Sequence, residues 1–400
     1  MKNGKAIRRI GLLTGGGDCP GLNAVIRGVA KCAMIRHGVD VVGFLDGYWG
    51  LVEGRFRELD YMSVSGILTT GGTILGTSNT ANPFRWTGTV PAVRGLSPRA
   101  ARKGTRLPSE KRNEGTVPHS GTVPISGSVP IDRSDDAVEV FRRLNLDALV
   151  TVGGDGTLSI AHKLMRKGIP VVGVPKTIDN DLNNTDVTFG FNTAVTTATE
   201  AIDKIHTTAM SHHRVMVVEV MGRYAGWIAL HAGTAGGSDV ILIPEIPYDL
   251  QKVCDYCLAR SRVGKRFTIV AVAEGARAKR GKMVVAKMLK ESTDPVRLGG
   301  IGNVVAQQIA ECTGLETRAC VLGHIQRGGT PTPFDRTLAT MFGTRAMELV
   351  AKHRFGRMVA FRNWTVTDVT LQSAVSKLKL VRRNDPLVLA AKAVGTCFGD

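Results

Sequence analysis

The chain has 400 residues, of which 43% are hydrophobic and 22% charged, a composition that excludes disorder along the whole chain and leaves room for two cores. The net charge of +18 raises the question of a nucleic-acid partner, but residues 85–133 hold nine Lys/Arg against three Asp/Glu and so contribute six of the eighteen charges. Only 5% of the residues are aromatic, and no basic stripe alternates with aromatic residues, so we predict that the protein does not bind nucleic acid.

The N-terminal residues 1–9 are basic, but the apolar run at 10–13 is too short for the core of a signal peptide. No apolar run reaches the roughly 18 residues of a membrane-spanning helix. The seven cysteines are odd in number and lack framework spacing, so we expect reduced thiols in a cytoplasmic protein. Cys254 and Cys257 share one face of an expected helix, which favours two semi-buried thiols over a zinc site.

Short apolar runs alternate with longer amphipathic segments along most of the chain. The strand-like runs lie at 8–14, 39–45, 147–154, 169–175, 213–220, 239–245 and 266–275. Helical periodicity in the segments between them favours crossover helices and parallel strands. The sequence therefore predicts the α/β class, with two Rossmann-like, doubly wound lobes of mainly parallel sheet and flanking helices.

Residues 87–130 interrupt this pattern with a low-complexity segment. The segment is rich in Gly, Pro, Ser and Arg, and it repeats Gly-Thr/Ser-Val-Pro. Such a composition offers little apolar surface to offset the entropy of ordering, so we expect a mobile surface insertion. Contact of its arginines with phosphate is the alternative.

The first chemical motif is Gly15-Gly16-Gly17-Asp18, which connects an expected strand to an expected helix. A glycine turn before a helix N-terminus lets backbone N–H groups meet a phosphate. The motif matches neither the dinucleotide fingerprint nor the Walker loop. A tight structural turn explains its glycines about as well as a phosphate site does.

The second motif, Gly153-Gly154-Asp155-Gly156-Thr157, follows another expected strand. An aspartate among glycines that favour anions is explained if Asp155 holds Mg²⁺ carried in by a nucleotide, although Asp155 could also serve as a turn residue.

The third motif is GVPKTIDND, residues 173–181, at the end of the next apolar run. Of its two carboxylates, one could accept a hydroxyl proton while the other works through metal or water, and Lys176 could balance a transferring phosphoryl group. The alternative is that Asp179 and Asp181 only cap the next turn. Strand ends at a switch point of an open α/β sheet bind ligands, so we expect the three motifs to converge.

Further polar residues follow expected strands in the second half of the chain. They are Arg223 in VMGRYAGW, Glu245 after DVILIP, and His324 and Arg327 in GHIQRGG. An arginine fork suits a phosphate monoester, and a carboxylate suits sugar hydroxyls. Donor phosphates on one side and an acceptor phosphate on the other predict a sugar-phosphate kinase.

Taken together, the motifs GGGDCPGLNAVIRG, GGDGT, PKTIDND, VEVMGRYAGW and GHIQRGGTPTPFDR resemble the 6-phosphofructokinase family over nearly the whole chain. The resemblance implies phosphoryl transfer to the 1-hydroxyl of fructose 6-phosphate, with Asp179 as the general base and Asp155 as the Mg²⁺ ligand. It adds Thr177, Asp181, Lys176 and Arg223 to the catalytic set. Donor phosphates would contact Gly17, Gly154, Gly156 and Thr157.

The same resemblance implies a sugar-phosphate site made of Thr177, Asp179, Met221, Gly222, Arg223, Glu245, His324 and Arg327. Arg214 and Arg318 match arginines that reach across from a neighbouring subunit, which implies an obligate homo-oligomer with a shared substrate site, as a dimer or tetramer. The larger, nucleotide-binding lobe would comprise 1–190 plus about 325–376. The smaller, sugar-phosphate-binding lobe would comprise 191–324 plus about 377–400.

The family contains ATP enzymes and pyrophosphate enzymes, and two residues bear on the donor. An aspartate in place of Gly156 would repel an α-phosphate, so Gly156 favours ATP. Lys176 points to pyrophosphate, because pyrophosphate-using members of the family carry lysine at this position, whereas the allosteric bacterial ATP enzymes carry glycine. The combination of Gly156 with Lys176 resembles a mixed group of the family whose members use ATP. We therefore expect ATP to be the phosphoryl donor. A pyrophosphate-dependent enzyme and a catalytically silent, nucleotide-binding paralogue are the alternatives.

Overall fold

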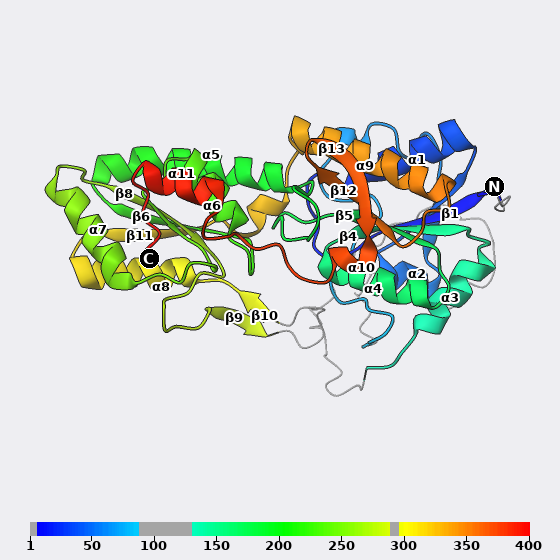
Figure 1. Cartoon of the computed structure of the whole chain (residues 1–400), viewed down its shortest axis with the longest axis horizontal. Helices are drawn as coiled ribbons and strands as arrows, with labels where there is room; N and C mark the ends of the chain where they lie inside the picture. Colours follow the sequence, from blue (N-terminus) through cyan, green and yellow to red (C-terminus); the bar gives the residue numbers. More distant parts are fainter. Residues whose placement is uncertain (1–5, 88–129, 289–295) are drawn as a thin grey trace, which may run out of the picture.

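The structure is a computed structural model that describes residues 6–87, 130–288 and 296–400. It contains two lobes side by side, with the N-terminus on one and the C-terminus on the other (Figure 1). The predicted α/β class with parallel sheets and flanking helices is confirmed. The insertion expected at 87–130 lies almost entirely outside the described residues.

The larger lobe is built on a sheet that has seven strands within the described residues, in the order β13-β12-β5-β4-β1-β2-β3. Its edge strands β3 and β13 pair antiparallel and the other strands pair parallel. The strands are β1 (Arg9–Thr14), β2 (Asp40–Phe44), β3 (Phe56–Leu59), β4 (Ala148–Gly153), β5 (Val171–Pro175), β12 (Arg357–Arg362) and β13 (Thr365–Thr370). β4 and β5 are buried throughout, which explains why they read as continuous apolar runs.

Helices cover both faces of this sheet because successive strand residues point to opposite sides. Leu12 packs into the core under α1 and α9, while Leu13 packs into the core under the helices of the other face. One face carries α1 (Leu22–Cys32), its continuation η1 (Ala33–His37), and α9 (Pro333–Ala351); the other carries α2 (Tyr48–Glu53), α3 (Ser134–Arg143), α4 (Asp155–Arg166) and α10 (Leu371–Ala374).

Helices α1 and α9 approach closely because glycines face each other at their crossing. A Cβ on Gly343 would lie 2.8 Å from the carbonyl oxygen of Val25, and one on Gly28 would lie 3.1 Å from that of Thr340. Larger side chains at these positions would push the helices apart.

The smaller lobe has a parallel sheet with four strands within the described residues, in the order β11-β6-β8-β7. The strands are β6 (Val215–Val220), β7 (Val240–Leu242), β8 (Thr268–Ala273) and β11 (Thr317–Val321). One face carries α5 (Phe191–His212), α6 (Trp227–Ala235) and α11 (Pro386–Ala393); the other carries α7 (Leu250–Arg262) and α8 (Ile301–Thr313). Beside them lies the antiparallel pair β9 (Val285–Met288) and β10 (Val296–Leu298).

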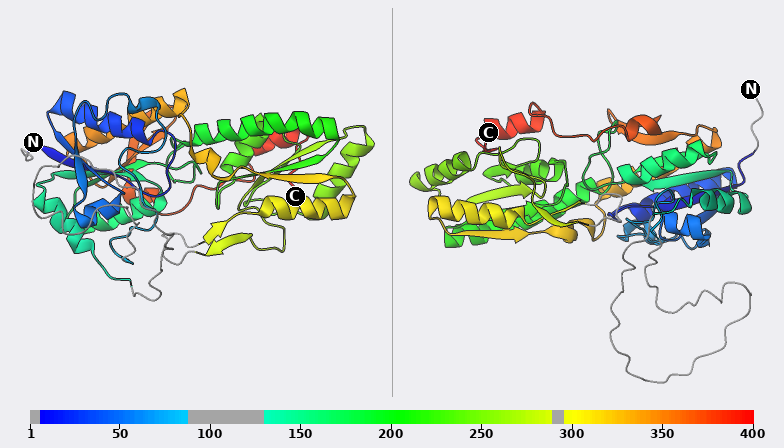
Figure 2. Two further views of the ribbon diagram at one scale, coloured as in Figure 1. Left: turned by 180° about the vertical axis from the view of Figure 1, so that it is seen from behind. Right: turned by 90° about the horizontal axis from the view of Figure 1, so that it is seen from below.

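The chain passes between the lobes repeatedly, so that neither lobe is one continuous stretch (Figure 2). Residues 176–190 lead from β5 to α5, the 3₁₀ turn η4 (Gly323–Arg327) leads from β11 to α9, and residues 375–385 lead from α10 to α11. One apolar cluster continues from the α1–α9 face to the α5–α6 face, with Phe189 edge-on to Phe342 at 6.5 Å between ring centroids.

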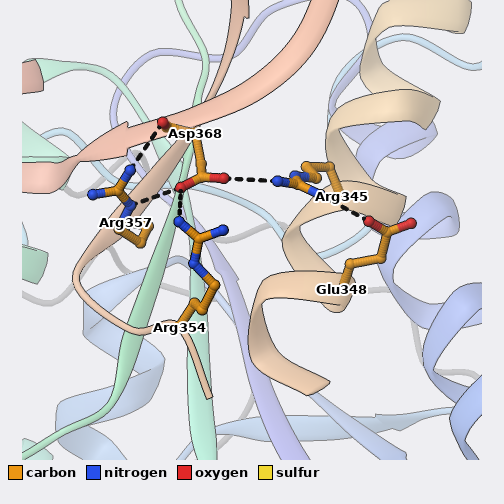
Figure 3. A network of polar contacts seen from close by, with 5 residues as sticks. All are labelled: Arg345, Glu348, Arg354, Arg357 and Asp368. Atoms are coloured by element: carbon orange, nitrogen blue, oxygen red, sulfur yellow. Dashed lines mark hydrogen bonds and ion pairs between the residues drawn. The ribbon is translucent and has the colours of Figure 1, made fainter. Parts of the chain in front are cut away.

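A buried carboxylate fixes the C-terminal hairpin of the larger lobe (Figure 3). The Asp368 side chain on β13 is 3% exposed and accepts from Arg345 of α9 at 2.7 Å, Arg357 of β12 at 2.7 Å and Arg354 at 3.0 Å. Burial alone would raise the pKa of Asp368, but the bonds from Arg345 and Arg357 outweigh it and hold the pKa below its usual value.

The expectation that all seven cysteines are reduced is wrong for one pair. Cys254 on α7 and Cys312 on α8 form a disulfide with their Cα atoms 6.4 Å apart. Because the two residues are 58 positions apart, no local spacing could indicate the pairing. Cys257 is a buried free thiol. Among the helices of the described residues, none is both long and apolar enough to cross a membrane.

Candidate active site

The three loops expected to converge do so, because they follow neighbouring parallel strands. β4 pairs with β1 on one side and β5 on the other, which brings the carboxyl ends of all three strands to one edge of the sheet. Backbone bonds continue this pairing into the loops: Gly15 N–H donates to Val152 at 2.9 Å, and Lys176 N–H donates to Gly153 at 3.0 Å.

The loop after β4 ends in a helix N-terminus with free backbone donors. α4 begins at Asp155, and its first intrahelical bond runs from Leu158 N–H to the Gly154 carbonyl at 2.9 Å. The N–H groups of residues 155–157 precede that bond, which makes this turn suitable for an anion. A Cβ on Gly15 would lie 2.8 Å from the Thr157 side chain, so only glycine lets the loops approach this closely.

Lys176 joins the third loop to the first. Its Nζ donates to the carbonyl oxygen of Gly17, and the residue is 3% exposed. Burial lowers the pKa of Lys176, while nearby Cys19 opposes that shift. Because the ammonium of Lys176 is already buried, an anionic ligand could pair with it without first removing much of its water.

Two carboxylates of the third loop are buried at the same place. Asp179 and Asp181 are 5% and 6% exposed, and Asp179 Oδ1 has no hydrogen-bond partner among the described residues. Burial, followed by the charges of Asp179 and Asp155, raises the pKa of Asp181 to about 7. The unpartnered Oδ1 argues against a capping role for Asp179, because a capping carboxylate accepts backbone N–H groups.

The backbone of this loop is held by its own polar groups. Thr177 Oγ1 accepts from Asp179 N–H at 3.0 Å, and the Thr177 carbonyl accepts from Thr188 Oγ1 at 2.7 Å. Between the two aspartates, Asn180 adopts a left-handed conformation with φ of 53°. That conformation is tolerated best by Gly, Asn and Asp, so Asn180 belongs to the shape of the loop.

The smaller lobe presents a second set of groups at the carboxyl ends of its strands. After β6, Met221 N–H donates to Gln326 Oε1 at 3.3 Å and Arg223 N–H donates to Glu274 Oε1 at 2.9 Å. Gly222 has φ of 139°, and a Cβ there would lie 2.5 Å from the Ala225 carbonyl oxygen. The turn that carries Arg223 therefore requires glycine.

Arg327 connects the second set to the first. Its Nη1 donates to the Asp18 carbonyl at 3.2 Å, and a Cβ on Gly17 would lie 2.8 Å from the same nitrogen. His324 is exposed on the same 3₁₀ turn. The carboxyl ends of the two parallel sheets thus meet across this region.

Glu274, which follows β8, is a further carboxylate that the sequence motifs do not include. It is buried, and burial together with the charge of Asp179 raises the pKa of Glu274 to about 7. The signal was present, since a carboxylate directly after an apolar run is what drew attention to Asp155 and Asp179.

Glu245, which we expect to contact the sugar, is held in place by backbone N–H groups. Its carboxylate accepts from Gly226 N–H at 3.0 Å and from Val381 N–H at 2.9 Å. These bonds join the turn before α6 to the C-terminal segment, and Glu274 is held in the same way by the backbone N–H of Arg223.

Arg214 and Arg318 are not brought to the site of their own chain. Both pair with Glu316 at 2.9 Å, at the amino ends of β6 and β11. Met221 follows the six residues of β6, which at about 3.3 Å per residue places the two ends roughly 20 Å apart.

The described residues contain no group of three or more His, Cys, Asp or Glu side chains that could hold a metal by themselves. Mg²⁺ usually takes one or two carboxylates, with phosphates and waters as its other ligands. Asp155, whose charge acts on the buried Asp181, fits an ion that arrives with a phosphate ligand.

Comparisons with known proteins agree with this geometry. A family model described as Phosphofructokinase matches residues 9–350. The chain is 47% identical to ATP-dependent 6-phosphofructokinase 2 of Clostridium perfringens, over 98% of this chain and 99% of the relative. It is also 47% identical to ATP-dependent 6-phosphofructokinase of Spirochaeta thermophila, over 99% of this chain and 98% of the relative.

Other similar proteins differ in their donor or their size. Pyrophosphate--fructose 6-phosphate 1-phosphotransferase of Streptomyces coelicolor is 46% identical, over 98% of this chain and all of the relative. Among solved structures, Pichia pastoris phosphofructokinase in the T-state superposes with a TM-score of 0.72 at 29% identity, covering 94% of this chain and 36% of that one.

Proposed function

The chain belongs to the phosphofructokinase family, and from this membership we infer that it is an ATP-dependent 6-phosphofructokinase, a glycolytic kinase. The reaction transfers the γ-phosphoryl group of ATP to the 1-hydroxyl of fructose 6-phosphate. The observation that carries the inference is near full-length identity of 47% to two relatives of that name. Buried carboxylates between two facing parallel sheets supply the chemistry that such a transfer needs.

On the donor side, we propose that Gly17, Gly154, Gly156 and Thr157 contact the phosphates of ATP. The free N–H groups at the start of α4 support this, because they favour negative charge. Gly156 leaves room for an α-phosphate, and Lys176 would balance the phosphoryl group in transfer. Lys176 already bonds the Gly17 carbonyl, so it also holds the phosphate loop in place.

For the chemical step, we propose Asp179 as the general base that accepts the proton of the sugar hydroxyl. Its unpartnered oxygen supports this role, since a base needs a free lone pair in reach of its substrate. Asp155 would hold Mg²⁺, which when bound with the nucleotide neutralises charge on the phosphate oxygens. Thr177 would contact the sugar, and Asp181 would act on the hydroxyl through metal or water.

On the acceptor side, we propose that Arg223, His324 and Arg327 bind fructose 6-phosphate with the backbone of Met221 and Gly222. Arginine forks match phosphate oxygens. Glu245 would accept hydrogen bonds from sugar hydroxyls, because its two backbone bonds leave acceptor sites of the carboxylate unused. Glu274, which accepts from Arg223 N–H, is a second carboxylate on this side.

We further propose a homo-oligomer in the cytoplasm in which Arg214 and Arg318 complete the sugar-phosphate site of a neighbouring subunit. Their place at the far ends of β6 and β11 supports this, since they cannot reach the site of their own chain. The two predicted lobes would bind nucleotide and sugar phosphate, with boundaries near residues 190, 325 and 377.

The donor assay tests the proposed function. Purified protein is given fructose 6-phosphate and Mg²⁺ with either ATP or pyrophosphate, and fructose 1,6-bisphosphate is measured. We expect product with ATP; product only with pyrophosphate would identify the pyrophosphate enzyme. Absence of product with both donors would favour the silent paralogue.

A further inference from the structure

The catalytic loop at 176–189 is held by a segment from the far end of the chain. Leu182 pairs with Leu378 in an isolated antiparallel bridge. The next residue, Lys379, donates its backbone N–H to the Asp181 carbonyl at 2.7 Å. Residues 378–381 therefore lie directly along the stretch that carries both aspartates.

The ammonium of Lys379 is bonded three times to that loop. Nζ donates to Asn180 Oδ1 at 2.9 Å, to the Thr185 carbonyl at 2.9 Å and to the Asp186 carbonyl at 2.8 Å. A lysine ammonium has three protons, so these acceptors satisfy it completely and fix one geometry. Asn180 stands between Asp179 and Asp181 in a left-handed conformation, which makes its side chain a direct constraint on both.

The same residue is also tied to the smaller lobe. Trp227 at the start of α6 donates its indole N–H to the Lys379 carbonyl at 2.8 Å, and its ring lies 5.4 Å from Nζ. Two residues on, Val381 N–H donates to Glu245, which in turn accepts from Gly226 N–H. Gly226 and Trp227 directly follow the turn of Met221, Gly222 and Arg223.

We propose that Lys379 is a positioning residue of the phosphoryl-transfer reaction, which sets the Asp179–Asp181 loop relative to the Arg223 turn of the other lobe. This inference rests on the proposed function for its kinetic consequence. Lys379 does not touch the substrate. It acts through Asn180 and the Asp181 carbonyl on one side and through Trp227 on the other.

A cation at this place is explained by what it bonds. Burial of an ammonium is unfavourable unless hydrogen bonds replace its water, and the three loop oxygens do so. An apolar side chain of similar length would fill the space but would remove the one donor that joins all three acceptors. Asn180 Oδ1 and the Asp186 carbonyl would keep other donors, whereas the Thr185 carbonyl would lose its bond to Nζ. Because a misplacement of about 1 Å can cost 10²-fold in rate, the loss should appear mainly in kcat.

The experiment compares Lys379→Met, Lys379→Arg and the control Lys377→Met, an exposed lysine of the same segment. Each full-length protein is assayed for kcat and for KM of fructose 6-phosphate, and hydrogen exchange of peptides covering 176–189 is followed by mass spectrometry. We expect Lys379→Met to lower kcat about 10²-fold, with a smaller change in KM, and to speed exchange in this loop. Lys379→Arg should restore part of both, and Lys377→Met should match the parent.

Parent-like kcat and parent-like exchange in Lys379→Met would overturn the proposal. A lowered unfolding midpoint with unchanged kcat in the folded protein would overturn it equally, because that is the signature of a merely structural residue. If Lys379→Met does not fold, Lys379→Gln takes its place, because it keeps a donor but not the three bonds of the ammonium: reduced kcat with faster loop exchange supports positioning, and parent-like kcat and exchange refute it. If the parent phosphorylates no fructose 6-phosphate, the proposed function fails, while the exchange measurement still decides whether Lys379 anchors the loop.

Discussion

Asp368 and Asp181 are two carboxylates of the same lobe whose charged surroundings are opposite. Asp368 accepts from three arginines, and its pKa lies below the usual value (Figure 3). Asp181 is buried with the negative charges of Asp179 and Asp155 beside it, and burial followed by these charges raises its pKa to about 7. Burial acts to raise the pKa of both carboxylates, but three arginines outweigh it at Asp368, whereas two further carboxylates add to it at Asp181. The charged partners therefore decide whether such a carboxylate stabilises the fold or is left for a ligand to compensate.

The largest expected effect comes from Asp179, the unpartnered member of the acidic pair. Asp179→Asn keeps the size of the side chain but removes the proton acceptor. We expect kcat to fall by about 10²- to 10⁴-fold, with circular dichroism unchanged. Asp135→Asn, at an exposed surface position, serves as the matched control and should leave kcat intact. A near-parental rate in the Asp179 variant would contradict the assignment of the base.

The partnered carboxylate should give the reverse result. Asp368→Asn leaves three partly exposed arginines facing a neutral side chain. Loss of charged hydrogen bonds that are partly screened by solvent costs on the order of 1.5–3 kcal/mol of the free energy of unfolding. Urea unfolding measures this loss, and kcat of the folded variant should remain at the parental level. A large loss of kcat without loss of stability would mean that the cluster in Figure 3 takes part in function.

The pH dependence of stability tests the unusual surroundings of Asp181. Its pKa rises from 3.8 when unfolded to about 7 when folded, so between these values the folded protein binds more protons. Its favourable contribution to folding is therefore present at acidic pH and is lost as the pH rises toward 7. Asp181→Asn removes the ionised group, so the variant should be more stable than the parent at pH 8, by on the order of a few kcal/mol.

Urea unfolding of the protein without metal or nucleotide at pH 8, 6 and 4 checks this prediction. The advantage of the variant should shrink toward pH 4, where the parental carboxyl is protonated. A variant that is less stable than the parent at pH 8 would show that Asp181 has partners as effective as those of Asp368.

Local patterns were enough to predict the fold class and the meeting of three loops. The runs at 147–154 and 169–175 became neighbouring parallel strands, and parallel neighbours place their ends together. Long-range partners were beyond reach, because nothing near Lys379 in the sequence indicates contact with Asn180, 199 positions away. The same limit hid the pairing of Cys254 with Cys312 and the backbone bonds that engage Glu245.

The order of strands along the chain has a consequence for synthesis on the ribosome. The four-stranded sheet uses strands between residues 215 and 321, whereas the larger sheet needs β12 and β13 at 357–370 to cover β5. During translation all four strands of the smaller sheet can therefore pair first, while β5 remains an edge strand with unpaired backbone groups. The strand that leads into the catalytic loop is thus among the last parts of the larger sheet to be paired, and until then the nascent chain has an edge that must be kept from other strands.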